Sequence, residues 1–159
     1  MHLFIIGVGR SGTSLLQSML NSHSKIVFLK ENQVLRNILN GNINKNLSGE
    51  LLHQEIILKT NFNRLNLSIE NIDLDSPTKA YDSIIKSYKK SGKILFIGDK
   101  DPRNLDYVEK IQSTYPKSKV IMMTRDPRAV CASRLKAKWS KRHRFIFHPL
   151  IYFAQSSLF

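Results

Sequence analysis

Cysteine and acidic residues are scarce in this sequence of 159 residues. A single cysteine, Cys131, excludes an intrachain disulfide and favours a reducing compartment. Only 12 Asp and Glu stand against 25 Lys and Arg, so the formal net charge is +13 at pH 7 and an anionic partner is expected. No apolar run approaches the ~20 residues of a membrane-spanning helix, and the first run is too short for a signal peptide. We therefore expect a cytoplasmic protein without a membrane span.

Internal repeats, low-complexity linkers and obvious clusters of metal-binding residues are also lacking. The length suits a single domain over residues 1–159, long enough to bury a core. Hydrophobic residues make up 42% of the chain and charged residues 23%, which is ordinary for a globular protein. We expect no bound metal. The positive charge alone does not choose between a nucleotide, a sulfated or phosphorylated substrate, nucleic acid and a membrane surface.

Glycine is rare too, with seven in the chain, yet three of them fall in one turn at residues 7–12. The apolar residues 3–6 before this turn predict a buried strand, and the apolar spacing over 15–20 predicts a helix. A strand that enters a helix through such a turn directs several backbone N–H groups at one point, which suits a phosphate or sulfate. Arg10 adds a planar cation, so we predict an anionic nucleotide site.

Two motifs fit this turn. Residues 7–12 satisfy G-x-G-x-x-G, and Glu31 follows at roughly the 20-residue distance at which an NAD-binding Rossmann domain has its ribose-binding acid. Residues 7–14 also fit a P-loop in which Thr13 replaces the lysine, a loss that argues against an ordinary ATPase or kinase. A turn that uses glycine for its conformation alone is the third interpretation.

Strand-like and helix-like segments alternate along the rest of the chain. We expect strands at 3–6, 25–29, 94–97 and 119–124, and helices at 32–39, 50–60, 77–91, 104–114 and up to 134, with an irregular stretch at 61–75. This alternation predicts a parallel sheet covered by helices on both faces. Polar clusters follow the expected strands at 10–14, 30–31, 99–101 and 125–128. Because ligands of open parallel sheets collect at the carboxyl ends of strands, these clusters predict the functional site.

Four blocks in the sequence resemble those of the PAPS-dependent sulfotransferases (PAPS is 3′-phosphoadenosine 5′-phosphosulfate), and most closely the tyrosylprotein sulfotransferase branch with its bacterial relatives. The family patterns are P-R-S-G-T-T, G-E-E-T-R, N-K-D-P and R-D-x-R-x-x-x-x-S. Their counterparts here are residues 9–14, 29–33, 98–102 and 125–133, in the same order. The resemblance implies an α/β fold of the P-loop NTPase-like kind, a three-layer sandwich with a central parallel sheet.

The resemblance also implies a reaction and its residues. PAPS would donate a sulfuryl group to a hydroxyl of a tyrosine, a carbohydrate or a small alcohol, without a metal. The residues that would surround the 5′-phosphosulfate are Arg10, Ser11, Gly12, Thr13 and Ser14. Arg125 and Ser133 would hold the 3′-phosphate. Glu31 would be the general base for the acceptor, and Lys100 and Arg10 would stabilise charge on the transferring group. An acidic acceptor would suit the positive charge.

Other interpretations of these residues remain open. Glu31 also suits the first turn of a helix, and Lys100 between Asp99 and Asp101 also suits an exposed ion-pair cluster. Gly9 stands where the family has proline, and Lys30 where it has the first glutamate.

Family members continue beyond the equivalent of residue 159, and the apolar stretch 145–159 closes this sequence. We therefore expect that the C-terminal part of the fold is missing; either the chain is truncated, or a second copy or another partner covers the apolar tail. The basic run 136–144 supports an alternative function, a non-catalytic basic fragment that binds nucleotide or nucleic acid. The resemblance makes nucleic acid the less favoured partner. An NAD-binding Rossmann domain is the least favoured alternative.

Overall fold

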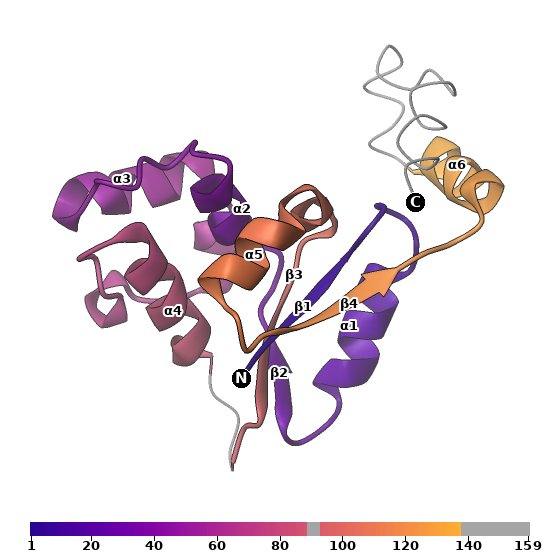
Figure 1. The fold of residues 1–159 in the computed structure, drawn as a ribbon, viewed down its shortest axis with the longest axis horizontal. Helices are drawn as coiled ribbons and strands as arrows, with labels where there is room; N and C mark the ends of the chain where they lie inside the picture. Colours follow the sequence, from indigo (N-terminus) through magenta and orange to yellow (C-terminus); the bar gives the residue numbers. More distant parts are fainter. Residues whose placement is uncertain (89–92, 138–159) are drawn as a thin grey trace.

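A four-stranded parallel sheet forms the centre of the protein (Figure 1). The computed structural model describes residues 1–88 and 93–137. The strands are β1 (His2–Gly7), β2 (Ile26–Phe28), β3 (Phe96–Lys100) and β4 (Lys119–Met123). Their order in the sheet is β2-β3-β1-β4, and every pair is parallel. The expected α/β fold with a parallel sheet is therefore confirmed.

Helices lie on both faces of this sheet. They are α1 (Thr13–Asn21), α2 (Val34–Leu39), α3 (Gly49–Lys59), α4 (Pro77–Ser87), α5 (Val108–Thr114) and α6 (Pro127–Lys136), with short 3-10 turns at η1 (Phe62–Leu65), η2 (Ile69–Asn71) and η3 (Pro102–Tyr107). In Figure 1, α1 lies on one face, and α2, α4 and α5 lie on the other with α3 beyond them. This arrangement gives the three layers that the sequence predicts.

The central strand β1 shows why both faces are covered. Its side chains alternate, so Phe4 and Ile6 join the large core formed with α2, α3, α4 and α5. Leu3 and Ile5 point the other way, into a smaller cluster with Phe28 and α1. All four side chains are buried, which explains the uninterrupted apolar run at the N-terminus.

The strand β3 begins and ends later than its apolar run predicts. The expected strand at 94–97 is wrong by two or three residues, because β3 pairs with β1 from Ile97 up to Lys100. Asp99 and Lys100 are therefore inside the strand and buried, not in a turn after it. The hydropathy pattern does not predict their burial, because that burial depends on a hydrogen-bond partner for each side chain: Tyr81 for Asp99 and Glu31 for Lys100.

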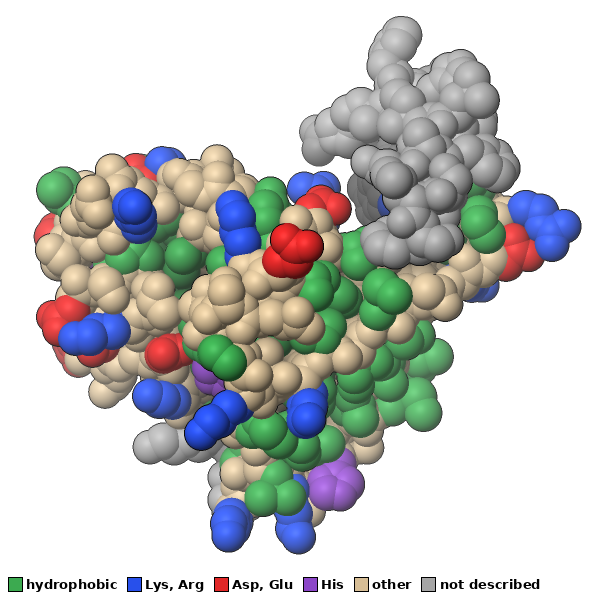
Figure 2. All heavy atoms as spheres, in the orientation of Figure 1, with side chains coloured by type: hydrophobic (Ala, Val, Ile, Leu, Met, Phe, Trp, Pro, Cys, Tyr) green, Lys and Arg blue, Asp and Glu red, His purple; other side chains and the backbone are tan. Residues whose placement is uncertain are grey.

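Smaller differences occur at other element ends. The strand β2 is shorter than the predicted 25–29, and the predicted helix 104–114 is the 3-10 turn η3 followed by α5. The helix α4 ends at Ser87 rather than near Ser91, with Tyr88 in an extended conformation after it. In α1, Leu16 and Leu20 contact the sheet cluster, whereas Leu15 and Met19 are exposed. Hydrophobic side chains accordingly gather on the surface over α1 and β4 in Figure 2.

The tail at 145–159 and most of the basic run 136–144 lie outside the described residues. Within residues 1–88 and 93–137, no helix is long and apolar enough to cross a membrane.

Candidate functional site

The turn between β1 and α1 is held tightly by its own backbone. Gly7 has φ of 137°, and a Cβ there would lie 2.4 Å from the carbonyl oxygen of Met123, so only glycine fits. The Ser11 N–H donates to the Val8 carbonyl at 3.1 Å, and the Ser11 hydroxyl donates to the same oxygen. Gly12 also has a positive φ of 100° and begins α1. The glycines thus shape a compact loop at the carboxyl end of the central strand.

Arg10 connects this loop to two later segments. Its φ of 78° is unusual for a residue with a side chain, and such strain concentrates at functional sites. The Arg10 carbonyl oxygen accepts a hydrogen bond from Nη1 of Arg125 at 3.1 Å. The Arg10 Nε donates to the hydroxyl of Ser133 at 3.0 Å. Arg10 therefore contacts two predicted site residues that lie 115 and 123 positions further along the sequence.

The N-terminus of α1 follows Arg10 closely, and its cap residue Gly12 lines the same hollow as Arg125. Gly12 at its cap supplies no side-chain hydrogen bond, and the first turn carries no acidic residue. The first N–H groups of a helix lack intrahelical partners, and the helix dipole favours an anion there. Ser11 and Thr13 are buried in the loop, whereas Ser14 is exposed. The residues present therefore fit an anionic phosphate or sulfate group.

A second cluster lies at the end of β3. The Nζ of Lys100 is 2.5 Å from Oε2 of Glu31, in the loop between β2 and α2. The lysine side chain is 6% exposed and the glutamate 39%, so the carboxylate reaches solvent while the ammonium is enclosed. The sequence predicted both residues, but not their contact. An ion-pair cluster of Lys100 with Asp99 and Asp101 is not what the structure shows, because Lys100 bonds to Glu31 and both aspartates bond elsewhere.

Side chains that the sequence analysis did not select hold the Glu31 loop. Asn32 is fully buried; its Oδ1 accepts from the N–H of Val34 at 2.9 Å, and its Nδ2 donates to the Lys30 carbonyl at 3.1 Å. Gln17 of α1 donates to the Leu29 carbonyl at 2.6 Å. The local Asn32 pattern is an Asx turn, which was visible in the sequence as an asparagine before a helix. The Gln17 contact had no local signal.

Two buried aspartates flank Lys100 in the chain. Tyr81 of α4 donates its hydroxyl to Oδ2 of Asp99 at 3.0 Å. Burial, and then the nearby charge of Asp101, raise the pKa of Asp99 to about 7. Asp101 lies 3.0 Å from Nη1 of Arg36 in α2 and caps η3 by accepting from the N–H of Arg103 at 3.1 Å. Burial raises the pKa of Asp101, and the charge of Arg36 opposes this shift.

The second arginine of the 125–128 block has a different role. Arg128 is exposed and binds Asp126, which also accepts from the Arg128 backbone N–H at 2.8 Å and begins α6. This ion pair leaves Arg125 as the cation of the block that contacts the β1–α1 loop.

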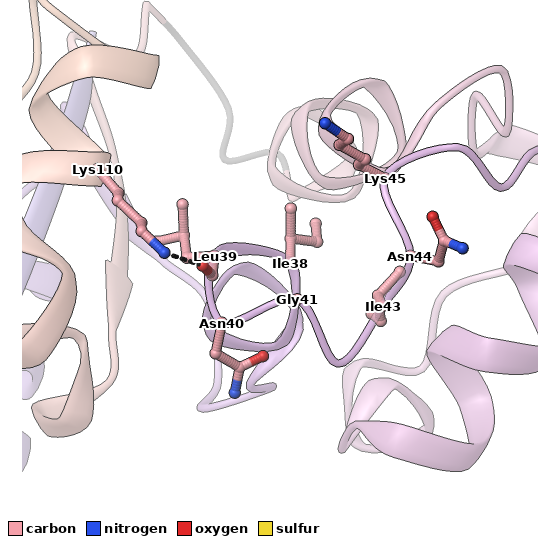
Figure 3. A pocket seen from close by; sticks show the side chains of 8 residues that line it. All are labelled: Ile38, Leu39, Asn40, Gly41, Ile43, Asn44, Lys45 and Lys110. Carbon is pink, nitrogen blue, oxygen red and sulfur yellow. Dashed lines mark hydrogen bonds between the residues drawn. The ribbon is translucent and has the colours of Figure 1, made fainter.

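Two of the hollows on the surface of the described residues bear on the site. One, of about 390 Å³, adjoins the loop and is lined by Ser11, Gly12, Leu15, Leu16, Met19, Met123 and Arg125. The other, of about 440 Å³, lies between the C-terminal end of α2 and α5 (Figure 3). There Lys110 donates to the Leu39 carbonyl at 2.9 Å, a contact typical of a lysine at a helix C-terminus. The first hollow contains predicted site residues and the second contains none.

The sheet order decides between the two motifs of the loop. A Rossmann domain has its second strand beside its first, so that the acid after the second strand reaches the same nucleotide. Here β3 separates β2 from β1. Glu31 is bound to Lys100 at the end of that intervening strand. The topology therefore favours the P-loop interpretation over an NAD site.

The described chain is thus an α/β protein with a glycine-containing loop after its first strand and charged residues gathered at the same sheet edge. A family model, the sulfotransferase family, matches residues 2–149. The chain belongs to the sulfotransferase family. No curated protein matches the sequence. Membership supports sulfuryl transfer as the general activity, and members of the family generally use PAPS as donor.

Proposed function

We propose that the protein transfers a sulfuryl group from PAPS to a hydroxyl acceptor, as a relative of the tyrosylprotein sulfotransferase branch. The observation that carries the proposal is the convergence of Arg10, Arg125 and Ser133 beside the N-terminus of α1. PAPS carries anionic groups at two positions, and this site offers two adjoining sets of donors, in contact through Arg10. The loop would hold one set of oxygens, and the arginine and serine from the end of β4 and from α6 the other.

The donor would lie along this edge of the sheet. The residues that would hold the 5′-phosphosulfate are Arg10, Ser11, Gly12, Thr13 and Ser14. Arg125 and Ser133 would hold the 3′-phosphate. Ser133 accepts a hydrogen bond from Nε of Arg10. With PAPS bound, Arg10 would donate to the 5′-phosphosulfate instead, and the Ser133 hydroxyl would donate to the 3′-phosphate. The apolar hollow beside Arg125, with Leu15 and Met19 in its wall, suits the adenine ring.

When bound, PAPS supplies a sulfuryl group on a phosphate leaving group. The oxygen of the acceptor hydroxyl would bond to sulfur while the bond between sulfur and the phosphate oxygen breaks. Glu31 would accept the proton that this hydroxyl loses. Lys100 holds this carboxylate in place and presents a positive charge where negative charge redistributes. Arg10 serves the same purpose from the loop. Positioning and charge stabilisation dominate transfers of this kind, so the fixed geometry of these groups is the main contribution of the chain.

The positive charge of the chain favours an acidic acceptor, such as a tyrosine in an acidic peptide, and carbohydrates and small alcohols fit the same chemistry. The scarcity of cysteine supports a cytoplasmic location. The apolar sequence of residues 145–159 supports a second copy or another partner as a cover for that stretch.

Calorimetry with 3′,5′-adenosine bisphosphate tests donor binding. We expect binding at least tenfold tighter than that of AMP, because Arg125 forms charge-assisted hydrogen bonds with the 3′-phosphate, each worth about 1.5–3 kcal/mol. Arg125→Ala should remove this preference. Arg128→Ala is the matched control, since Arg128 is an exposed arginine of the same block that pairs with Asp126 instead. Equal affinity for the two nucleotides would contradict the proposal.

The positive charge favours the second candidate, a non-catalytic protein that binds nucleic acid. Tight DNA binding that weakens with salt and survives Arg10→Ala would support that function instead.

A further inference from the structure

The ion pair between Arg36 and Asp101 links the two segments that carry the predicted catalytic pair. Asp101 follows Lys100 directly at the end of β3, and Arg36 lies in α2, shortly after Glu31. Lys100 bonds to Glu31, and the next residue, Asp101, bonds to Arg36. Two ion pairs therefore join the end of β3 to the segment at 31–36. In the pair of Lys100 with Glu31 the glutamate is partly exposed to solvent, whereas both side chains of the Arg36–Asp101 pair are buried.

The Arg36–Asp101 pair is well placed to fix this geometry. The side chains are 10% and 2% exposed. One guanidinium nitrogen, Nη1 of Arg36, lies 3.2 Å from Oδ1 and 3.0 Å from Oδ2 of Asp101. Oδ1 also accepts the Arg103 N–H, so this one carboxylate connects β3, η3 and α2. A buried pair is poor support for overall stability because both charges lose their hydration, but it can define one arrangement of the segments that it joins.

We propose that Arg36 and Asp101 are positioning residues, which hold the Glu31 loop against the end of β3 so that the carboxylate stays in contact with Lys100. The catalytic consequence rests on the proposed sulfuryl transfer. A base displaced by about 1 Å costs a reaction up to the order of 10²-fold, so loss of this contact should affect turnover strongly. It should leave donor binding intact, because Arg10 follows β1 and Arg125 and Ser133 follow β4, whereas this pair joins the end of β3 to α2.

The test compares two single variants with the double variant. Arg36→Met leaves a buried carboxylate without its partner, and Asp101→Asn leaves a buried guanidinium without its partner, so both should unfold at lower urea concentration. Asn at position 101 can still cap η3. The double variant R36M/D101N removes both charges together, and we expect its urea midpoint to return toward that of the unmodified chain.

Two measurements on the double variant separate positioning from a purely structural role. Amide hydrogen exchange at residues 29–35 should rise at least tenfold, with exchange in α1 unchanged. With labelled PAPS and an acidic tyrosine peptide, kcat should fall by about 10- to 100-fold, and the affinity for 3′,5′-adenosine bisphosphate should stay within about twofold. The control is Y115F/D82N, which removes the 3.0 Å hydrogen bond between Tyr115 and Asp82 in the same layer and should change none of these quantities.

Exchange and turnover equal to those of the unmodified chain, in a folded double variant, would overturn the inference. An unmodified chain that neither binds 3′,5′-adenosine bisphosphate nor transfers sulfate would contradict the proposed function instead. The exchange measurement, which needs neither donor nor acceptor, would then decide the positioning role by itself.

Discussion

Asp99 should make the stability of this protein depend on pH in an unusual direction. The carboxyl group is fully buried next to the Tyr81 hydroxyl, and burial raises its pKa from the ordinary 3.8 to about 7. The folded state therefore prefers the protonated form. Between these two pKa values the folded chain binds more protons at this position than the unfolded chain does, so the free energy of unfolding falls as the pH rises.

The size of the effect follows from the two pKa values. A difference of about three pKa units corresponds to about 4 kcal/mol, since each unit is worth 1.36 kcal/mol. The contribution is fully present below about pH 4, is lost progressively up to about pH 7, and is constant above that. Asp99→Asn keeps an oxygen acceptor for Tyr81 and cannot titrate. The variant should therefore gain about 3–4 kcal/mol relative to the unmodified chain between pH 4 and pH 8.

Urea unfolding followed by circular dichroism at a series of pH values measures this difference. When the free energy of unfolding of the unmodified chain is subtracted from that of Asp99→Asn at each pH, the contributions of groups that titrate in both chains cancel. Asp126→Asn provides a control of opposite sign: Asp126 is exposed, and its hydrogen bonds with Arg128 lower its pKa, so its contribution is present at neutral pH and lost in acid. A flat difference curve for Asp99→Asn, or one that slopes as the control does, would refute the reasoning.

Two further substitutions address the site itself. Glu31→Gln should reduce sulfate transfer by about 10²- to 10⁴-fold, the usual contribution of a general base, with unchanged binding of 3′,5′-adenosine bisphosphate in calorimetry; retained turnover would remove Glu31 from that role. Gly7→Ala should lower the urea midpoint and weaken nucleotide binding together, because its Cβ would lie 2.4 Å from the Met123 carbonyl oxygen and the φ of 137° disfavours a side chain. If Gly7→Ala had the urea midpoint and the nucleotide affinity of the unmodified chain, the loop would be able to accommodate a side chain at position 7, contrary to this prediction.

Local patterns predicted the parts of the fold that depend on local chemistry. The apolar run of β1 is buried on both faces, and Gly7 and Gly12 of the following turn have the positive φ values that only glycine adopts easily. The cap and proline at the start of α4 are also where the sequence indicates, with Ser76 accepting from the Lys79 N–H. In each case the neighbours along the chain determine the conformation.

Contacts between distant segments were beyond the reach of such patterns. Lys100 and Glu31 are 69 positions apart, and Arg36 and Asp101 are 65 apart, so no periodicity connects them. The end of β3 was misjudged for the same reason. The polar residues 99–101 predict a turn when the sequence is taken alone. Their partners on α2, α4 and the Glu31 loop, which allow them to be buried, are visible only in the structure. Burial of a charged side chain depends on a partner that only the tertiary structure supplies.

The two halves of the site differ in how firmly they are held, and this difference should separate binding from turnover. Arg10, Arg125 and Ser133 are exposed or half-buried and bond to one another in ways that an anion can replace. Lys100 is enclosed beside its carboxylate, and the buried aspartates on either side of it have partners of their own. A ligand can therefore rearrange the first half at little cost, whereas the second half is already in place before binding. Substitutions of Arg125 and Ser133 in the first half should chiefly raise Kd for the nucleotide, and those in the second half should chiefly lower kcat.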